Sequence, residues 1–446
     1  MKVEKFLVRA EHHVSQVVVC STIDRLIQNL PVSVVFFYRN SIESDVLVNS
    51  LKKVLSDFPI FAGTLKNINN DLCIDCNNQG ILFSVIQVDE TIDRILDELP
   101  RIEQERLVDI INPKKAISSQ SPVMTVKLTY SACGGMVMGI CWHHSIGDMH
   151  TFMQLMKAWS SLASQHEYVV PIITQDRDKY LQAKLQPNNH SISGVRYLSI
   201  REWFELGLYI LLQARNKIVL KFYFSESELN NMKQEFSEKA DKKLSKNDVL
   251  CSHLFGIISE LDKDERAKCL AIVVNYRSRL ELPQNILGNF FSTLNLSTSQ
   301  QVDPLRLSQN LRGAIDNFQR LHMDFFATKN YINENGGIEK IDRFIIKGID
   351  PIKKTLFVTS WANFSVYDVI FGGSQPFYFT PFGDPPFPWL SIISEGFANN
   401  GLIYSVVLPS KLAKNLIQDD NLKKIHRYRD QKEVMPELVE KLAWLL

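Results

Sequence analysis

The sequence predicts an α/β protein made of two domains, and three observations support this prediction. The chain has 446 residues, which is more than one ordinary hydrophobic core accommodates and suits two domains of about 200 residues each. Strand-like apolar runs, such as residues 34–38, alternate with segments of helical periodicity. Residues 184–194 contain Gln, Pro, Asn, Ser and Gly, which is typical of a linker. We therefore expect an N-terminal domain at residues 1–185, a crossover linker at 186–200 and a C-terminal domain at 201–446.

The composition is that of a soluble globular protein without a strong overall charge. Hydrophobic residues make up 45% of the chain and charged residues 22%. Lysine and arginine together number 50 against 49 for aspartate and glutamate, so the formal net charge is +1. This balance offers no general attraction to nucleic acid or to an anionic membrane, and we expect neither as a partner. An anionic cofactor would have to be recognised locally.

The sequence shows no export signal and no membrane segment. Its first residues lack the apolar core and the cleavage site of a secretory signal, and no apolar window approaches the roughly 20 residues of a membrane span. The 7 cysteines are spread over the chain, which suits a reducing compartment better than a disulfide framework. We expect a cytoplasmic protein that acts as a monomer.

Residues 136–150, with the sequence MVMGICWHHSIGDMH, form the stretch around which the chain is organised. An apolar run at 136–142 leads into two adjacent histidines, His143 and His144, and Asp148 follows four positions after the second. Apolar residues then recur at helical spacing, at Phe152, Leu155, Met156, Trp159 and Leu162. The pattern predicts a buried strand, a polar corner and a helix, and such connections often carry the functional residues of α/β proteins.

His144 has the properties of a general base. A neutral imidazole, whose unperturbed pKa is about 6.5, can accept a proton from an alcohol or amine near neutral pH and return it to a leaving group. Two other interpretations are open. The two histidines could pack or cap in the core, or His143, His144, Asp148 and His150 could bind a metal ion. Adjacent residues on a strand point to opposite faces, which argues against one shared ion, and we expect no metal.

The wider stretch at residues 123–148, VMTVKLTYSACGGMVMGICWHHSIGD, closely resembles the hairpin and active-site corner of the BAHD acyltransferases. These plant-type enzymes depend on coenzyme A and share an HxxxD motif. A second stretch, SLKKVLSDFPIFAGTL at residues 50–65, matches the family pattern of a helix followed by a Pro-x-x-Ala-Gly turn. The resemblance implies that His144 is the catalytic base and that Asp148 mainly shapes the site.

Two arginines in the second half of the chain also match the family. Arg277 and Arg279 precede a Gly-Asn pair, as in the family, where an arginine of this segment pairs with the HxxxD aspartate and ties the two domains together. A buried arginine is costly without a carboxylate, so Asp148 is a suitable partner. We favour Arg279 over Arg277. The family also often carries an Asp-Arg pair where this chain has Arg177.

The segment SKNDVL, at residues 245–250, resembles one whose start lies near the pantetheine arm of coenzyme A in the family. Either Ser245 or Asn247 can cap a helix here. Lys243 and Lys246 flank the expected helix start, where a phosphate would be attracted. The alternative is that both lysines are simply solvated. We assign these four residues to the binding of coenzyme A.

The chain departs from the family at its second signature, DFGWG, because residues 370–374 read IFGGS. That motif is structural in the family, so the departure leaves catalysis possible. Asn363 stands where branches that bind acidic acceptors have an arginine, and Trp361 and Phe379 lie among further aromatic residues. We expect these three residues at a pocket for a neutral or aromatic acceptor, unless the aromatic side chains face the core.

The resemblance implies two chloramphenicol acetyltransferase-like α/β domains, with mixed β-sheets flanked by helices and a channel between the domains. It implies acyl transfer from an acyl-coenzyme A co-substrate to a small alcohol or amine in specialised metabolism, with no bound cofactor. Two alternatives are open. One is a condensation-domain-like or carrier-protein-dependent acyltransferase, although the glycine usual after the aspartate is Met149 here. The other is a non-catalytic binding protein on the same scaffold.

Overall fold

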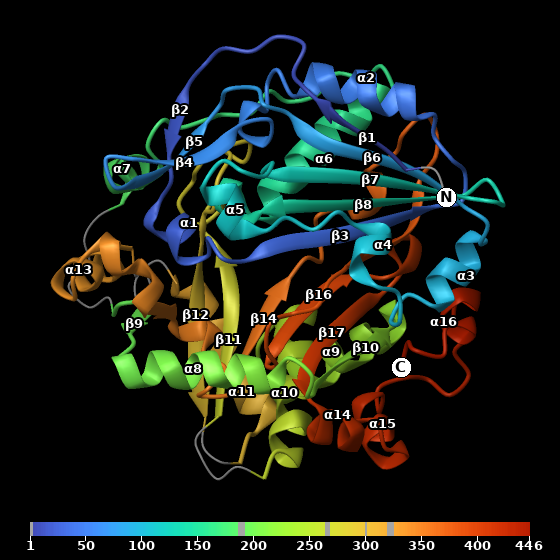
Figure 1. Cartoon of the computed structure of the whole chain (residues 1–446). Helices are drawn as coiled ribbons and strands as arrows, with labels where there is room; N and C mark the ends of the chain where they lie inside the picture. Colours follow the sequence, from blue (N-terminus) through green and yellow to red (C-terminus); the bar gives the residue numbers. More distant parts are fainter. Residues whose placement is uncertain (1–2, 186–191, 264–267, 299–300, 319–324) are drawn as a thin grey trace. The chain divides into compact units, whose positions relative to one another are not determined.

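The structure is a computed structural model that describes residues 3–185, 192–263, 268–298, 301–318 and 325–446. The chain forms two compact units, each built on a mixed six-stranded β-sheet with helices (Figure 1). The first unit comprises residues 1–186, 280–290 and 363–384. The second unit comprises residues 187–279, 291–362 and 385–446. The predicted α/β class with mixed sheets is confirmed.

The boundaries of the units differ from the predicted domain boundaries. Residues 280–290 and 363–384, which we assigned to the C-terminal domain, belong to the first unit. The second of these segments does so because its strand β15 (Pro376–Pro381) pairs with β3 (Pro31–Tyr38) of the first sheet. In the predicted linker, residues 186–191 lie outside the described residues. The linker also contains strand β9 (Val195–Tyr197), which pairs with β13 (Phe344–Ile346) of the second unit.

The first unit contains the six-stranded sheet and a smaller three-stranded sheet. Besides β3 and β15, the larger sheet consists of β1 (Val3–Val8), β6 (Ile81–Val88), β7 (Met124–Ser131) and β8 (Met136–His143). Its order is β1-β6-β7-β8-β3-β15, in which only β6 and β7 are parallel neighbours. The smaller sheet consists of β2 (Val17–Val19), β5 (Asp71–Asp75) and β4 (Thr64–Ile68), in that order.

The helices of the first unit are mostly short, with two longer ones that pack against each other. The α-helices are α1 (Thr22–Leu26), α2 (Ser44–Val54), α3 (Ile92–Asp97), α4 (Gln104–Leu107), α5 (Pro113–Ile117), α6 (Met149–Ala163) and α7 (Arg177–Lys184). The 3-10 turns are η1 (Pro59–Phe61), η2 (His144–Ile146) and η5 (Val366–Asp368). The contact between α2 and α6 includes a hydrogen bond of 3.0 Å from the indole nitrogen of Trp159 to the carbonyl of Leu47.

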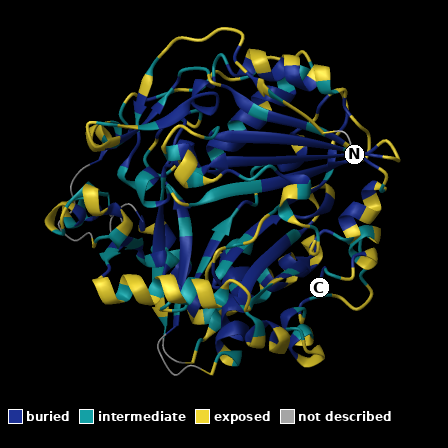
Figure 2. Cartoon of the chain, viewed as in Figure 1, coloured by how far each residue is buried: buried dark blue, intermediate teal, exposed yellow. Residues whose placement is uncertain are grey.

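The core of the first unit lies between its sheet and α6. Every residue of β8 is buried, and the central strands are dark blue in Figure 2. On one face of β8, the ring of Trp142 stacks on that of Phe152 of α6, with centroids 4.1 Å apart. Such stacking adds to the burial of two large aromatic surfaces. The apolar run and the helical periodicity predicted around residues 136–162 therefore bury against each other.

The opposite face of β8 requires a glycine at position 139. A Cβ atom built on Gly139 would lie 1.9 Å from the carbonyl oxygen of Leu107, so the backbone after α4 occupies the space that any side chain would need. We expect Gly139→Ala to lower the melting temperature by many degrees or to prevent folding, because two backbones would have to separate. Gly313→Ala is the control, since a Cβ on Gly313 meets nothing within 4 Å in its helix. An equally mild effect of both substitutions in thermal unfolding would contradict this packing.

The second unit repeats the mixed-sheet design with different strands. Its large sheet consists of β10 (Lys217–Phe224), β17 (Leu402–Pro409), β16 (Leu390–Glu395), β14 (Thr355–Ser360), β11 (Lys268–Asn275) and β12 (Phe291–Thr298), in that order. β14 runs parallel to both of its neighbours, and the other pairs are antiparallel.

The helices of the second unit surround a central buried helix, α10 (Lys246–Leu261). Its partners are α9 (Glu226–Ala240), α11 (Pro304–Asp316), α14 (Ser410–Leu416) and α15 (Asp419–Ile425). The remaining helices and turns in the described part of this unit are α8 (Ile200–Gln213), α13 (Phe325–Glu334), α16 (Glu437–Lys441), η3 (Ile338–Arg343), η4 (Lys347–Ile349) and η6 (Phe397–Asn399). Among the described residues, no helix combines the length and the apolar character that crossing a bilayer requires.

Helix α8 is exposed along most of its length (Figure 2). Its exposed apolar side chains recur at helical spacing, at Ile200, Trp203, Phe204, Leu208, Leu211 and Leu212. Burial therefore contributes little to its stability. The helix is instead supported by the capping box of Ser199 and Glu202 and by an ion pair of 2.7 Å between Arg201 and Glu205.

Candidate active site

The HxxxD residues lie at the predicted corner between a strand and a helix. Strand β8 ends at His143, the turn η2 begins at His144, and Asp148 is the N-cap residue of α6. Asp148 Oδ1 accepts a hydrogen bond of 2.9 Å from the backbone N–H of Thr151. An aspartate is favoured there because it satisfies a free N–H group and because its negative charge complements the helix N-terminus. Asp148 thus fixes the start of α6 relative to the turn.

The two adjacent histidines differ in their access to solvent. His143 is fully buried, and its Nδ1 accepts a hydrogen bond of 3.3 Å from the N–H of Ser145. Burial, with help from the neighbouring His144, lowers the pKa of His143 to about 4. His144 is partly exposed. Burial also lowers the pKa of His144, against the opposing effect of the carboxylates of Asp148 and Asp24. At neutral pH His144 is therefore an uncharged imidazole with an accessible edge.

Residues 280–290 of the first unit hold the start of α6 from the other side. The hydroxyl of Thr151 accepts from the N–H of Gly288 and donates to the carbonyl of the same residue, both at 2.9 Å. Asp148 Oδ2 accepts a hydrogen bond of 3.2 Å from the N–H of Phe290. Both carboxylate oxygens of Asp148 are therefore engaged by backbone groups, which agrees with a mainly architectural role.

A buried polar cluster lies beneath the turn η2, made of Asp24, Arg177 and Asn289. Arg177 and Asp24 form an ion pair of 2.8 Å, and both side chains are almost completely inaccessible to solvent. The side-chain amide of Asn289 donates to Asp24 Oδ1 at 2.7 Å. The sequence reasoning missed Asp24 and Asn289 as site residues. The one available signal for Asp24 is its capping box with Ser21 at the start of α1.

Arg277 and Arg279, the predicted partners of Asp148, belong to the second unit. Arg277 is fully buried, and its backbone N–H donates to the side chain of Asn275 at 2.9 Å. The guanidinium of Arg279 donates to the carbonyl of Ile315 at 2.8 Å and lies over the ring of Phe318. Their interaction with Asp148 stays a prediction. Within the first unit, the charge of Asp148 acts on Arg177 and helps to raise the pKa of that guanidinium.

The four residues assigned to coenzyme A lie at the start of α10. Ser245 is the N-cap and forms a capping box with Asp248. Of the two predicted caps, Ser245 and Asn247, the structure therefore uses Ser245. Asn247 is half-buried, and Lys246 forms an ion pair with Glu226. That ion pair makes Lys246 less available to a phosphate than we expected. Lys243 is exposed and free to contribute its charge to the neighbouring surface.

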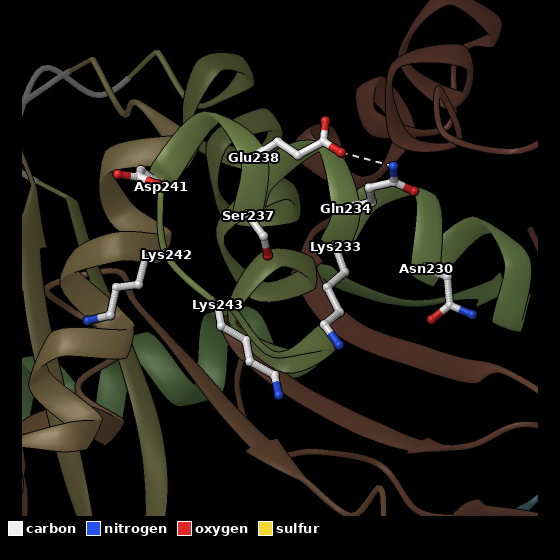
Figure 3. Close-up of a pocket in the computed structure, with 8 residues that line it drawn as sticks. All are labelled: Asn230, Lys233, Gln234, Ser237, Glu238, Asp241, Lys242 and Lys243. Carbon is white, nitrogen blue, oxygen red and sulfur yellow. Dashed lines mark hydrogen bonds between the residues drawn. The ribbon is translucent and has the colours of Figure 1, made fainter.

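Lys243 lines a shallow pocket of about 640 Å³ beside α9 (Figure 3). Lys233 and Lys242 contribute two more positive charges, and Glu238 and Asp241 contribute two negative ones. The other lining residues are Asn230, Gln234 and Ser237. Lys242 also forms an ion pair of 3.5 Å with Asp316. Lys233 and Lys243 are therefore the lysines of this pocket that suit an anionic group.

The three residues assigned to the acceptor pocket occupy different environments. Phe379 is fully buried, and its ring lies 4.8 Å from that of Phe36 in the core of the first unit. It therefore forms no exposed rim, and the alternative that this aromatic residue faces the core is correct. Trp361 is buried in the second unit, where its backbone N–H donates to the backbone carbonyl of Ile393 at 2.6 Å. Asn363 is exposed in the first unit, with a left-handed φ of 75°.

The altered second signature at residues 370–374 forms a tight turn. Phe371 packs edge-to-face against Trp159, with ring centroids 5.0 Å apart. Gly372 and Gly373 have φ values of 56° and 83°, which glycine adopts at little cost. The hydroxyl of Ser374 donates to the carbonyl of Asn40 at 2.9 Å. The segment thus anchors the entry to β15, which is a structural role.

The described residues contain no group of three or more His, Cys, Asp and Glu side chains placed to hold a metal ion. Of the histidines considered as metal ligands, His143 has its ring buried against the turn. The ring nitrogen Nε2 of His150 lies 2.8 Å from the carbonyl oxygen of Gln284. The described cysteines are free thiols, and Cys73 and Cys76 are both buried.

Comparison with known proteins finds a family and relatives that match most of the chain. A family model described as the Transferase family matches residues 2–419. Rosmarinate synthase from Plectranthus scutellarioides is 27% identical over 358 residues, which cover 78% of this chain and 80% of the relative. Anthranilate N-benzoyltransferase protein 1 from Dianthus caryophyllus is 26% identical and covers 76% of each chain.

Two solved structures are similar over nearly the whole chain. Vinorine synthase has a TM-score of 0.71 at 18% sequence identity, covering 95% of this chain and 98% of that one. TRI101 from F. sporotrichioides, complexed with coenzyme A and T-2, has a TM-score of 0.70 at 16% identity, covering 91% and 98%. Both solved structures share the mixed α/β fold of this chain. The chain belongs to the BAHD acyltransferase family, as the sequence resemblance predicted. It is an acyl-coenzyme A-dependent O- or N-acyltransferase, with acyl-coenzyme A as its co-substrate.

Proposed function

We propose that His144 is the general base of this acyl transfer and that Nε2 is its reacting atom. The observation that supports this most directly is the contrast between the two histidines, because His143 is fully buried and His144 reaches the surface. The lowered pKa of His144 keeps the imidazole neutral near pH 7, which is the form that accepts a proton. The turn that carries it is fixed on both sides, as a base requires.

The reaction then proceeds in two steps without an acyl-enzyme. His144 takes the proton from the acceptor hydroxyl or amine while the acceptor attacks the thioester carbonyl carbon. The tetrahedral intermediate collapses, the C–S bond breaks, and the coenzyme A thiolate leaves with a proton returned by the imidazolium. The ester or amide product and free coenzyme A result, and His144 is neutral again.

We assign the anionic end of coenzyme A to the surface near Lys243. Support comes from Lys233 and Lys243 of the pocket beside α9 and from the N-terminus of α10, where the N–H groups favour an anion. Ser245 already caps that helix, so its contribution is to hold the helix start in place. The near-zero net charge supports our further proposal that the enzyme has no nucleic-acid or membrane partner. We also propose that it is a cytoplasmic monomer.

The proposed function is tested by the release of free thiol from a panel of acyl-coenzyme A donors, each offered with alcohol and amine acceptors. We expect thiol release that depends on an acceptor and produces an ester or amide. A chain that uses only carrier-bound phosphopantetheine donors would instead be a condensation-like acyltransferase. Absence of transfer with every donor would favour the non-catalytic alternative.

We predict that the enzyme prefers a neutral or aromatic acceptor to an acidic one. Asn363 carries no charge, so it cannot pair with an acceptor carboxylate as an arginine would. Competition between an acidic acceptor and its neutral analogue measures the preference, and we expect the neutral compound to have the lower KM. An Asn363→Arg variant should shift the preference towards the acid. A lower KM for the acid that is insensitive to this substitution would mean that another cationic group recognises it.

A further inference from the structure

Three consecutive carbonyl groups of the turn η2 accept hydrogen bonds from buried side chains. The amide of Asn289 donates to the carbonyl of His144 at 2.7 Å. The guanidinium of Arg177 donates to the carbonyls of Ser145 and Ile146 at 2.9 and 2.8 Å. A three-residue turn leaves most of its carbonyl groups without a partner in the turn, so these side chains supply what the local backbone cannot.

Both donor side chains converge on one carboxylate, that of Asp24. Asp24 Oδ2 accepts from Arg177 at 2.8 Å, and Oδ1 accepts from Asn289 at 2.7 Å. Asp24 is itself fixed, because Oδ2 also accepts from the N–H of Ser21 at 2.6 Å and its carbonyl accepts from the hydroxyl of Ser145 at 2.7 Å. The carboxylate therefore determines where both donors lie.

The cluster is inaccessible to solvent, and the backbone at Gly288 packs closely against the side chain of Arg177. Asp24, Arg177 and Asn289 are 0%, 1% and 1% exposed. At Gly288, which has a φ of 143°, a Cβ atom would lie 2.8 Å from Arg177 Nε. The residue before Asn289 must therefore lack a side chain for the guanidinium to fit. In such a buried site neither charge is screened by salt or water.

We infer that Asp24, Arg177 and Asn289 are positioning residues that hold the turn η2 so that His144 faces the acceptor. This inference rests on the proposed role of His144 as the general base. They contact the backbone of the base and of the two residues after it, so they control the direction of the imidazole without touching substrate. Asp24 and Arg177 carry opposite charges, so the pair places less net charge beside the base than either residue would alone. A misplacement of about 1 Å at such a group costs on the order of 100-fold in rate.

Removing one charge at a time gives a readout that a merely structural role would not produce. The charged or titratable groups around His144 in the first unit are Asp24, Asp148, Arg177 and His143. Asp24→Asn leaves the Arg177 cation uncompensated, so the acidic limb of kcat/KM should move to lower pH. Arg177→Met leaves the Asp24 anion, so the limb should move to higher pH. We expect shifts on the order of half a pH unit or more in opposite directions. Shifts in one direction, or none, would overturn the inference.

Asn289→Ala tests the positioning role with the ion pair between Asp24 and Arg177 intact. It is the decisive test if neither Asp24→Asn nor Arg177→Met folds. We expect kcat to fall on the order of 10- to 100-fold, with both KM values within about 2-fold and the acidic limb unmoved. The matched control is Asn421→Ala in the second unit, because the buried amide of Asn421 likewise donates to a carbonyl, that of Asn415, at 2.8 Å. Its kcat should be unchanged. A wild-type kcat in Asn289→Ala would contradict the inference.

His144→Ala separates this inference from the proposed function. If His144→Ala retains full activity, the assignment of the base is wrong. If His144→Ala is inactive while Asn289→Ala turns over normally, the base assignment survives and only the positioning role fails. All rates are expressed per folded enzyme, measured by circular dichroism on the full chain.

Discussion

Replacing His144 with alanine is expected to slow acyl transfer on the order of 100-fold or more while leaving a folded protein. Loss of a general base has this effect because the acceptor must then lose its proton to water. The protein should fold because the side chain is partly exposed and the hydrogen bonds of the turn involve the His144 carbonyl, which alanine retains. Free-thiol release at saturating acyl-coenzyme A measures the rate, and circular dichroism checks the fold.

His143→Ala is the matched control for this substitution. His143 is the adjacent imidazole, but it is fully buried, and its ring accepts a hydrogen bond from Ser145. Its loss should lower stability and change turnover per folded enzyme far less. Equal losses of turnover in the two variants would mean that the base has been assigned wrongly.

The pH dependence of the wild-type enzyme gives the same assignment a second test. Burial lowers the pKa of His144, so the imidazole stays neutral down to a lower pH than a free histidine, whose pKa is about 6.5. As the pH falls through this lowered pKa, the base becomes protonated and kcat/KM should decrease. The acidic limb should therefore lie below about pH 6.5. A limb above that value would disagree with the buried environment of the ring.

Asp148→Asn is expected to lower both the melting temperature and the rate of transfer. One carboxylate oxygen becomes an amide N–H₂ group, which would face a backbone N–H donor of Thr151 or Phe290 instead of accepting from it. The negative charge at the N-terminus of α6 is lost as well. The lost charge costs about 0.3–1 kcal/mol, and a buried N–H group left without its acceptor costs about 1–3 kcal/mol. We expect a decrease of several degrees in thermal unfolding, with turnover reduced on the order of 10-fold or more.

Asp303→Asn provides a cap of the same kind away from the site. Asp303 is the N-cap of α11 and accepts a hydrogen bond of 3.0 Å from the N–H of Leu305. This substitution keeps a capping oxygen and removes the charge, so it should lower the melting temperature only slightly and leave turnover per folded enzyme unchanged. An Asp148→Asn enzyme with an unchanged melting temperature and no activity would instead point to a catalytic dyad of His144 and Asp148.

The corner that carries His144 and Asp148 could be predicted because its signals are local. The apolar run of β8, the two histidines and the helical spacing of α6 occupy one continuous stretch, so strand, turn and helix follow from periodicity and capping alone. Ser245 was predictable for the same reason, since a cap and its helix are adjacent in the sequence. The family resemblance added the chemistry, which periodicity does not give.

The cluster beneath the turn could not be predicted because its members are distant in the chain. Arg177 lies 153 positions from Asp24, and Asn289 lies 265 positions from it. No sequence pattern predicts that an aspartate or an arginine is fully buried, since both residue types are usually exposed. The prediction that Phe379 lies at the acceptor pocket was wrong for a related reason. An aromatic residue in a strand has the same sequence pattern whether it lines a pocket or packs in a core.

The pairing of β15 with β3 has a consequence for how the protein is made. Strand β3 is complete at residue 38, but the neighbour that covers its edge ends at residue 381. At about 5–20 residues per second, the ribosome needs roughly 20–70 seconds to synthesise the intervening chain. During that time the nascent first sheet presents an unpaired edge rich in valine and phenylalanine, which is a template for aggregation. The first unit thus cannot complete its fold while it is the only part synthesised, and a chaperone that shields this edge during translation would raise the yield of native enzyme.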